Sequence, residues 1–502
     1  MQSRSSVKIN LAASWLDQGI GLLIGIVLMP YVLHTLGDET YGIWLLINSF
    51  AGYQCFFYLG FGDTVCRFVA KYHAQRDWDR MNQVVSVIFF SYVGMGVLAF
   101  LVAVGVACWA PSLHDWGGES PAEIQLVILV LGLSAFLAMS TTVFGGVLVG
   151  IQRFDIERGF NLLSGVVRLV LTLVFLQQEW ALLTLSLVFL VVTLTEHIGH
   201  VIFAFRKVPT LRIGFRGLRW STTRELFSFS AFEFLNSVSR QCLEVTDTVI
   251  IGIVLGAKAT VPYYIAMRLC KFIRLPIEQI GQVFMPRAGE LHANSERTEL
   301  RSLVTKGVGM SFLLTMGFFI GTGFFGTTLI ETWVGPGYGE SHLLLLVLLG
   351  TQVIATPLAV FRSVLFGMGH VRAQSLMNLA KAIANIGLSI LLIKPFGLMG
   401  VALGTAIPVL VVELGMLLPF AVRKVQLELG RLIRDALGPQ LVALAALLGY
   451  SLVVADNVEL HANWFFLIAV ALGGGVVLAL GWLAHAQAEK HWRGAKTLTP
   501  NS

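Results

Sequence analysis

Long apolar runs restrict what this chain can fold into more than any other feature of its sequence. Runs such as 122–150 and 399–422 contain one charged residue each, and a helix needs roughly 20 apolar residues to cross a bilayer. Charged residues make up 13% of the chain, about half the share in soluble domains. A single soluble core stops growing at roughly 250–300 residues, and barrel strands would alternate in polarity. The sequence therefore predicts an all-α polytopic membrane protein and excludes a soluble enzyme.

The apolar segments predict about 14 transmembrane helices. To within a few residues, they are 9–34, 40–62, 82–110, 122–150, 157–177, 181–205, 226–255, 261–285, 304–330, 342–368, 374–394, 399–422, 437–455 and 463–485. The loops between them alternate in charge: loop 206–225 has six Lys or Arg residues, whereas loops on the opposite side have only Lys258 and Lys394 as cations. Basic loops face the cytoplasm, so both termini are expected there.

The chain resembles itself at a constant offset between its two halves. The matching segments are Val147–Gly150 with Val364–Gly367, Asn161–Leu162 with Asn378–Leu379 and, at a similar offset, Leu36–Gly37 with Leu255–Gly256. The repeat predicts two pseudo-symmetric six-helix lobes plus two C-terminal helices. The expected divisions are a lobe at 1–205, a cytoplasmic linker at 206–225, a lobe at 226–422, two additional helices at 423–486 and a cytoplasmic tail at 487–502. Transporters built from such repeats bind substrate between their halves.

Several kinds of chemistry find no support in the sequence. The loops are too short for a catalytic domain, and there is no phosphate-binding P-loop motif, so neither an enzyme nor a nucleotide is expected. The net charge of +6 reflects the basic loops and does not indicate nucleic acid. Gly321–Gly326 matches G-x-G-x-x-G, but it lies inside an apolar run, where small residues serve helix packing. Glu196, His197 and His200 favour hydrogen-bonded packing over a metal, and no cofactor is expected.

Charges inside the spans mark the candidate site, because ionisable groups at bilayer depth are costly. Those of the seventh span lie within roughly 60° of one another and those of the eighth within about 120° at helical periodicity. They are Glu233, Arg240, Glu244 and Asp247 in the seventh span and Arg268, Lys271, Arg274 and Glu278 in the eighth. Such stripes indicate either a polar cavity or a closed salt-bridge network between helices. Glu413 lies alone in the twelfth span, and Arg362 and Lys381 are close enough to the cytoplasmic end to snorkel.

Cations outnumber anions among these intramembrane positions. Arginine matches phosphate oxygens bidentately and lysine serves as a point charge, so the excess favours an amphiphile with a phosphate-bearing head. The predicted substrate-binding residues are Arg168, Arg240, Arg268, Lys271, Arg274, Arg362 and Lys381. An exporter of organic cations would instead be expected to have surplus Asp and Glu.

The intramembrane carboxylates are candidates for ion coupling or gating. They are Asp17, Glu233, Glu244, Asp247 and Glu413. Burial raises the pKa of a carboxyl group and a nearby arginine lowers it, so Glu244 or Asp247 is predicted to exchange H⁺ or Na⁺ for substrate. The alternative is that these groups neutralise Arg240 and that the membrane potential alone drives export, since it supplies about 2.3 kcal/mol per charge per 100 mV.

Four stretches of the sequence resemble the polysaccharide transporters of the MOP exporter superfamily, which includes the O-antigen (Wzx-type) flippases. They are Leu36–Trp44, Gly60–Arg67, Asp247–Gly252 with Leu255–Gly256, and Phe396–Leu403. The resemblance implies alternating access in the bacterial cytoplasmic (inner) membrane. It also implies an undecaprenyl-diphosphate-linked glycan as substrate, with a polysaccharide polymerase and a chain-length regulator as partners.

Other members of the superfamily supply alternative functions. A lipid II flippase has a similar length and span count, but its first spans carry deep basic residues, whereas the first span here carries only Asp17. A cation-coupled multidrug extruder would be expected to have twelve spans and acidic sites. A non-transporting scaffold of a polysaccharide assembly complex remains a further alternative. A glycosyltransferase or polymerase would need larger loops.

Overall fold

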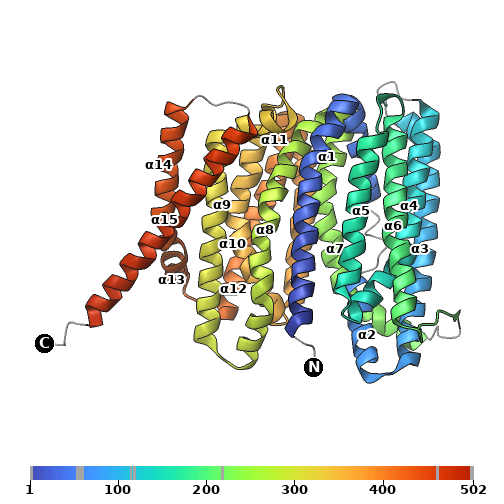
Figure 1. The fold of residues 1–502 in the computed structure, drawn as a ribbon, viewed down its shortest axis with the longest axis horizontal. Helices are drawn as coiled ribbons and strands as arrows, with labels where there is room; N and C mark the ends of the chain where they lie inside the picture. Colours follow the sequence, from blue (N-terminus) through green and yellow to red (C-terminus); the bar gives the residue numbers. More distant parts are fainter. Residues whose placement is uncertain are drawn as a thin grey trace. The chain divides into compact units, whose positions relative to one another are not determined.

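The computed structural model describes residues 4–52, 61–113, 116, 120–215, 220–458 and 463–497, and within these ranges every regular element is a helix (Figure 1). The chain divides into two compact units, Met1–Val261 and Pro262–Ser502. The first contains α1 (Arg4–Gly52), α2 (Phe61–Gln75), α3 (Trp78–Leu113), α4 (Pro121–Gly150), α5 (Phe154–Phe175), η2 (Gln178–Trp180), α6 (Ala181–Lys207), α7 (Trp220–Leu255) and η4 (Ala257–Ala259).

The second unit begins within the first turn of α8. Its helices are α8 (Thr260–Ala293), α9 (Arg297–Val334), α10 (Glu340–Gly367), α11 (Val371–Val412), η5 (Glu413–Leu417), α12 (Leu418–Val425), α13 (Leu429–Leu432), η6 (Ile433–Leu437), η7 (Gly438–Gln440), α14 (Leu441–Asn457) and α15 (Trp464–Thr497). Contacts group α7 with the first unit, whereas the sequence analysis assigns 226–255 to the second lobe. The predicted lobe boundaries stay a prediction.

The prediction of an all-α polytopic membrane protein is confirmed. Among the described residues, ten segments are long and apolar enough to cross a membrane, compared with the fourteen expected. Helices α7 and α8 are absent from the ten because each contains at least three charged residues within its apolar segment. In addition, the segments Gly19–Ser49 and Val371–Val425 each contain a glycine with positive φ, Gly37 and Gly397, at which two predicted spans join.

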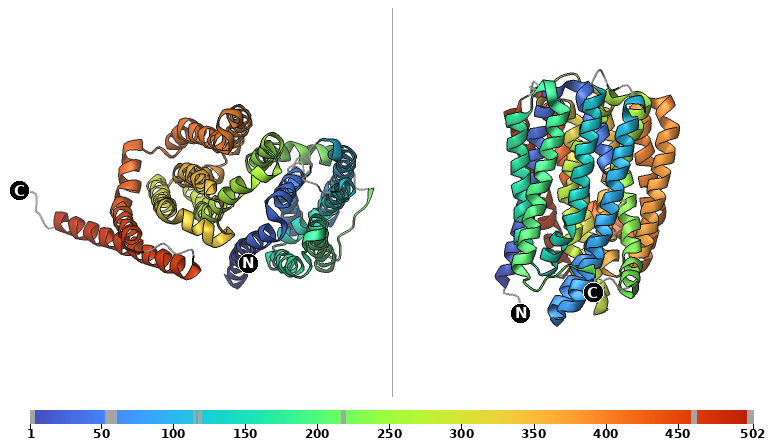
Figure 2. Two further views of the ribbon diagram at one scale, coloured as in Figure 1. Left: turned by 90° about the horizontal axis from the view of Figure 1, so that it is seen from above. Right: turned by 90° about the vertical axis from the view of Figure 1, so that its right-hand side faces the viewer.

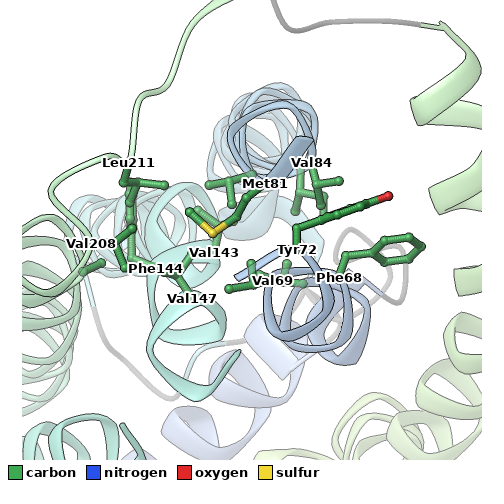
Figure 3. Packing of buried hydrophobic residues seen from close by; sticks show 14 of the residues in the cluster. Phe68, Val69, Tyr72, Met81, Val84, Val143, Phe144, Val147, Val208 and Leu211 are labelled. Atoms are coloured by element: carbon green, nitrogen blue, oxygen red, sulfur yellow. The ribbon is translucent and has the colours of Figure 1, made fainter. Parts of the chain in front are cut away.

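The core of the first unit lies where α2, α3 and α4 meet the chain that follows α6. Figure 3 shows apolar side chains from these four segments pointing toward one another. Val69, Met81, Val143 and Val147 are completely buried there. Close packing of this kind makes each position sensitive to volume. Figure 2 shows that the long helices of this unit run roughly parallel to one another.

Glycine brings two helices into backbone contact in each unit. A Cβ atom added to Gly150 of α4 would lie 3.0 Å from the carbonyl oxygen of Cys66 in α2. In the second unit, a Cβ atom added to Gly367 of α10 would lie 2.5 Å from the carbonyl oxygen of Met285 in α8. These glycines belong to the matched segments of the sequence repeat, so the same close approach recurs in both units.

The repeat also appears in the backbone conformation of matched turns. Gly37 has φ 73° and ψ 171°, and its counterpart Gly256 has φ 95° and ψ 159°. The turns that follow α4 and α10 contain Gln152 with φ 64° and Gly369 with φ 82°, which occupy matched positions of the repeat. Positive φ is costly for residues with a side chain. The two copies of the repeat therefore share local geometry that the sparse sequence matches only indicate.

Helix α11 is a hairpin of two apolar segments on either side of Gly397, whose φ is 56°. A Cβ atom on Gly404 would lie 2.5 Å from the Ser389 side chain, and one on Gly400 would overlap the Leu392 carbonyl group. The two arms therefore run antiparallel in backbone contact. Small residues permit this approach in membrane helices, and the hairpin holds Lys381 on one arm and the start of η5 at the end of the other.

Candidate substrate-binding site

The second unit gathers charged side chains from α8, α10, α11 and η5 into one cluster. Helical spacing places Arg274 and Glu278 one turn apart on α8. Arg362 follows Pro357 in α10, Lys381 lies on the first arm of α11, and Glu413 begins the π-helical turn η5. Single π turns interrupt α-helices frequently at functional positions. The five charged residues Arg274, Glu278, Arg362, Lys381 and Glu413 are called the charged cluster below.

Glu413 is the centre of the charged cluster. Its Oε1 atom accepts hydrogen bonds from Arg362 Nη1 at 2.5 Å and from Lys381 Nζ at 2.8 Å. The Glu413 side chain is 1% exposed and that of Lys381 9% exposed. The sequence leaves Glu413 alone in its span, but the structure gives it two cationic partners, and neither Arg362 nor Lys381 is free to extend along the helix away from it.

The ion pairs at the outer edge of the charged cluster are longer. Glu278 Oε1 lies 3.8 Å from Arg362 Nη2, and Glu278 Oε2 lies 3.9 Å from Arg274 Nε. These three side chains are between 23% and 28% exposed. The cluster therefore has a buried layer around Glu413 and an accessible layer that contains two arginines. With three cations and two anions, it has a net charge of +1.

Backbone contacts hold Arg362 in place. Its Nη2 atom donates to the carbonyl oxygen of Ala355 at 3.4 Å, and its own carbonyl oxygen accepts from Gln374 Nε2 at 2.8 Å. Pro357 lacks an N–H, which leaves a helix carbonyl group without its usual donor near this turn. The guanidinium group is thus held by Glu413 at Nη1 and by Ala355 at Nη2, and Nη2 also faces Glu278.

A polar stripe that the sequence analysis did not identify continues from Lys381 along α11. Asn385 and Ser389 follow at four-residue intervals, and both are completely buried. Asn385 Nδ2 donates to Thr405 Oγ1 at 2.8 Å, and the Tyr263 hydroxyl group lies 3.5 Å from the same oxygen. The sequence does contain the pattern that predicts this stripe, which is a series of polar residues at helical spacing within an apolar segment. Glu278 was also part of the α8 stripe but was not assigned a role.

The other predicted residues of α8 lie outside the five-residue cluster. The Arg268 guanidinium group is 5.0 Å from the Phe272 ring, which in turn makes an edge contact with Trp333. Lys271 is half-buried on the same helix. A cation over an aromatic face is stabilised by the ring quadrupole, so Arg268 has a defined position near the charged cluster on α8.

The remaining predicted residues belong to the first unit. Arg168 on α5 and Arg240 on α7 are exposed, and Arg240 Nη2 donates to Ser237 Oγ at 3.5 Å. Glu244 is half-buried and Asp247 is 2% exposed. The side chains of Asp17 and Glu233 lie outside the described part of the structure. Of the predicted substrate-binding residues, the second unit thus brings together Arg274, Arg362 and Lys381.

The two motifs assigned to packing do pack helices. Gly326 of α9 lies against the His342 ring of α10, which bonds to the Thr322 carbonyl oxygen at 3.0 Å. On α6, His200 Nε2 lies 3.4 Å from the Glu157 carbonyl oxygen, and its ring makes an edge contact with Phe160. The G-x-G-x-x-G match is therefore a helix contact, and His200 joins α6 to α5.

Solved structures share this fold. The lipid II flippase MurJ in an inward closed conformation aligns with a TM-score of 0.68, covering 96% of this chain and 98% of that one at 12% identity. A multidrug resistance MATE transporter of the MOP superfamily, in its inward-facing conformation, aligns with a TM-score of 0.67 over 83% and 98% of the chains at 16% identity. Both likenesses support the predicted all-α polytopic membrane fold.

Sequence comparisons point to polysaccharide biosynthesis. The family model described as polysaccharide biosynthesis protein matches residues 8–292. The uncharacterized membrane protein EpsK of Bacillus subtilis is 20% identical over 80% of both chains. A putative O-antigen transporter of Shigella flexneri is 20% identical over 78% of this chain and 92% of its own length. A probable low-salt glycan biosynthesis flippase of Haloferax volcanii is 21% identical over 38% and 40%. The chain belongs to the polysaccharide biosynthesis protein family.

Proposed function

We propose that this protein is a flippase that moves an undecaprenyl-diphosphate-linked oligosaccharide from the cytoplasmic to the outer leaflet by alternating access, for O-antigen, exopolysaccharide or capsule assembly. The observation that carries the proposal is the charged cluster: two accessible arginines and an excess of cations within an apolar helical unit. The family and its glycan-exporting relatives support the same substrate class.

The chemistry of the diphosphate fits this cluster. A diphosphate diester has two negative charges and several acceptor oxygens, and arginine pairs with such groups bidentately. Arg274 and Arg362 are the accessible pair, and Glu413 and Lys381 form the buried layer behind Arg362. An exporter of organic cations would need the opposite excess, so the charge of the cluster argues against a multidrug extruder.

The substrate tail and the membrane potential complete the proposal. A long prenyl chain is as apolar as the bilayer and stays in lipid while the head group crosses. Export of two negative charges from a negative-inside cell is electrically downhill by about 2.3 kcal/mol per charge per 100 mV. Exchange of H⁺ or Na⁺ at Glu244 or Asp247 is proposed as an additional coupling. The proposal places both termini in the cytoplasm.

Flipping in proteoliposomes tests the function. With a lipid-linked oligosaccharide in the inner leaflet and an added glycosidase or lectin outside, the wild type should expose substrate faster than protein-free vesicles. Arg274→Gln should slow flipping roughly ten- to a hundredfold, because one charged hydrogen-bonding partner contributes about 1.5–3 kcal/mol. Arg287→Gln is the matched control, since Arg287 is an exposed arginine of the same helix with its own acidic partners.

The substrate used in the assay separates the alternatives. Faster flipping of lipid II than of any lipid-linked oligosaccharide would identify a peptidoglycan-precursor flippase instead. Transport of an organic cation without flipping of either lipid would contradict the proposal and favour a multidrug extruder. Failure to transport any of these substrates would leave a scaffold role.

A further inference from the structure

We propose that Glu278 is a built-in competitor for the substrate phosphate: its carboxylate occupies the place between Arg274 and Arg362 that a phosphate group takes on binding, and it thereby lowers the affinity of the site. The inference rests on the proposed function and adds to it a residue that sets how tightly the substrate head group is held.

The geometry of Glu278 is that of a bridge between two arginines. Each carboxylate oxygen faces a different guanidinium group, at 3.8 Å for Arg362 and 3.9 Å for Arg274. Both distances exceed the roughly 2.7–3.2 Å of a hydrogen bond from N–H to oxygen. The carboxylate is therefore held by charge attraction across a gap.

Glu413 is a permanent partner of Arg362, and its distance and burial can be compared with those of Glu278. It lies at 2.5 Å from the same guanidinium group and its side chain is 1% exposed, whereas that of Glu278 is 27% exposed. Removal of Glu413 would leave buried charge behind, which is strongly unfavourable. Glu278 can swing away at low cost, because exposed or partly exposed ion pairs contribute little. Of the two anions, Glu278 is the one that a ligand can displace.

A diphosphate satisfies the two arginines better than Glu278 does. It has two negative charges, and its tetrahedral oxygens can come within hydrogen-bond distance of both guanidinium groups, where charge-assisted bonds are strong. The substrate displaces Glu278 when it binds, and Glu278 returns after the substrate is released. One anion is thus exchanged for another at the same position. Such competition weakens net binding, which favours release of a substrate that must leave after each cycle.

Binding of a prenyl diphosphate tests the inference directly. The full-length protein in detergent micelles is titrated with farnesyl diphosphate at fixed ionic strength, with farnesol as the uncharged control probe. Glu278→Gln should lower the Kd about threefold to fivefold, the range expected when a partly exposed competing charge is removed. Glu290→Gln should leave the Kd unchanged, because Glu290 is an exposed glutamate of the same helix paired with Arg287.

The outcomes distinguish this inference from the function on which it rests. An unchanged or higher Kd for Glu278→Gln, with normal binding by the wild type, would overturn the competitor role and show that Glu278 only positions the arginines. Glu278→Asp keeps the charge and should bind like the wild type; a gain equal to that of Glu278→Gln would also overturn the inference. If Glu278→Gln does not fold, Glu278→Met removes the same charge, and its Kd for farnesyl diphosphate provides the same test. If the wild type and Glu290→Gln bind farnesyl diphosphate no better than farnesol, the proposed function itself fails.

Discussion

At the scale of single residues, Glu413 explains how two basic side chains are tolerated inside an apolar unit. One carboxylate oxygen accepts from both Arg362 and Lys381, and the group is almost completely buried. Ionised groups are rarely buried without a partner because desolvation is costly. Lys381 and Glu413 lie far apart in the sequence, so their mutual neutralisation depends on the fold of α11.

Neutralisation of Glu413 should destabilise the protein. Glu413→Gln leaves the buried Lys381 without its anion and Arg362 with only the more distant Glu278, and breaking a buried pair in this way costs about 3–5 kcal/mol. The free energy of unfolding, measured by denaturant titration in mixed micelles, should fall by that amount. Glu299→Gln is the control, because Glu299 is exposed beside Arg287 and its pair contributes roughly 0–1 kcal/mol. Equal losses in the two variants would show that the buried pair has no special role.

At the scale of elements, the α11 hairpin determines which charges meet. Gly397 has positive φ and reverses the chain, and Gly400 and Gly404 let the second arm lie against the first. This contact sets the axial register of the arms. Lys381 on the first arm and Glu413 after the second consequently reach hydrogen-bond distance.

A methyl group at Gly404 should disturb this register. Its Cβ atom would lie 2.5 Å from the Ser389 side chain, and overpacking of this kind costs about 1–3 kcal/mol. Gly404→Ala should lower the midpoint of thermal unfolding in detergent. Gly387→Ala on the same helix is the matched control, since no atom lies within 4 Å of a Cβ atom there, and it should be neutral or slightly stabilising. Identical midpoints for the two variants would contradict the close contact of the arms.

At the scale of the whole molecule, the two repeats share turns but differ in charge. In the register that matches Val147–Gly150 with Val364–Gly367, Glu413 corresponds to Glu196, while Arg362 and Lys381 correspond to Gly145 and Ser164. The Ser164 hydroxyl group lies 3.5 Å from a Glu196 carboxylate oxygen, at the place where the second unit has an ammonium group. The first unit thus has the carboxylate of the charged cluster without its two matched cations.

This asymmetry predicts one diphosphate site per chain. Titration of the wild type with farnesyl diphosphate should saturate at one equivalent, and Arg362→Gln should remove that site. Ser164→Ala should leave both the stoichiometry and the Kd unchanged, because the first repeat lacks the matched cations. Native mass spectrometry can count the bound molecules. Two equivalents in the wild type, of which one persists in Arg362→Gln, would contradict a single site.

Much of this architecture was determined by the sequence alone, because it depends on local properties. Continuous apolar runs predict membrane helices wherever they occur, and the repeat aligned Leu36–Gly37 with Leu255–Gly256, where both glycines have positive φ in the structure. Charge stripes at helical spacing directed attention to α8, which contributes Arg274 and Glu278 to the charged cluster. The charges of α7 and α8 were read as functional, and they are also why these helices are missing from the ten apolar segments.

Only the tertiary structure decided which charges meet. Helical periodicity places residues on a face, but the partner of that face depends on the rotation and axial register of a second helix, which distant contacts determine. Glu413 therefore looked isolated in the sequence and proved to bind Arg362 and Lys381, and Glu278 gained its position between two arginines. Arg240 and Arg168 had the same chemistry in the sequence, yet they fold into the first unit, because the helices that hold them, α7 and α5, pack there against α1.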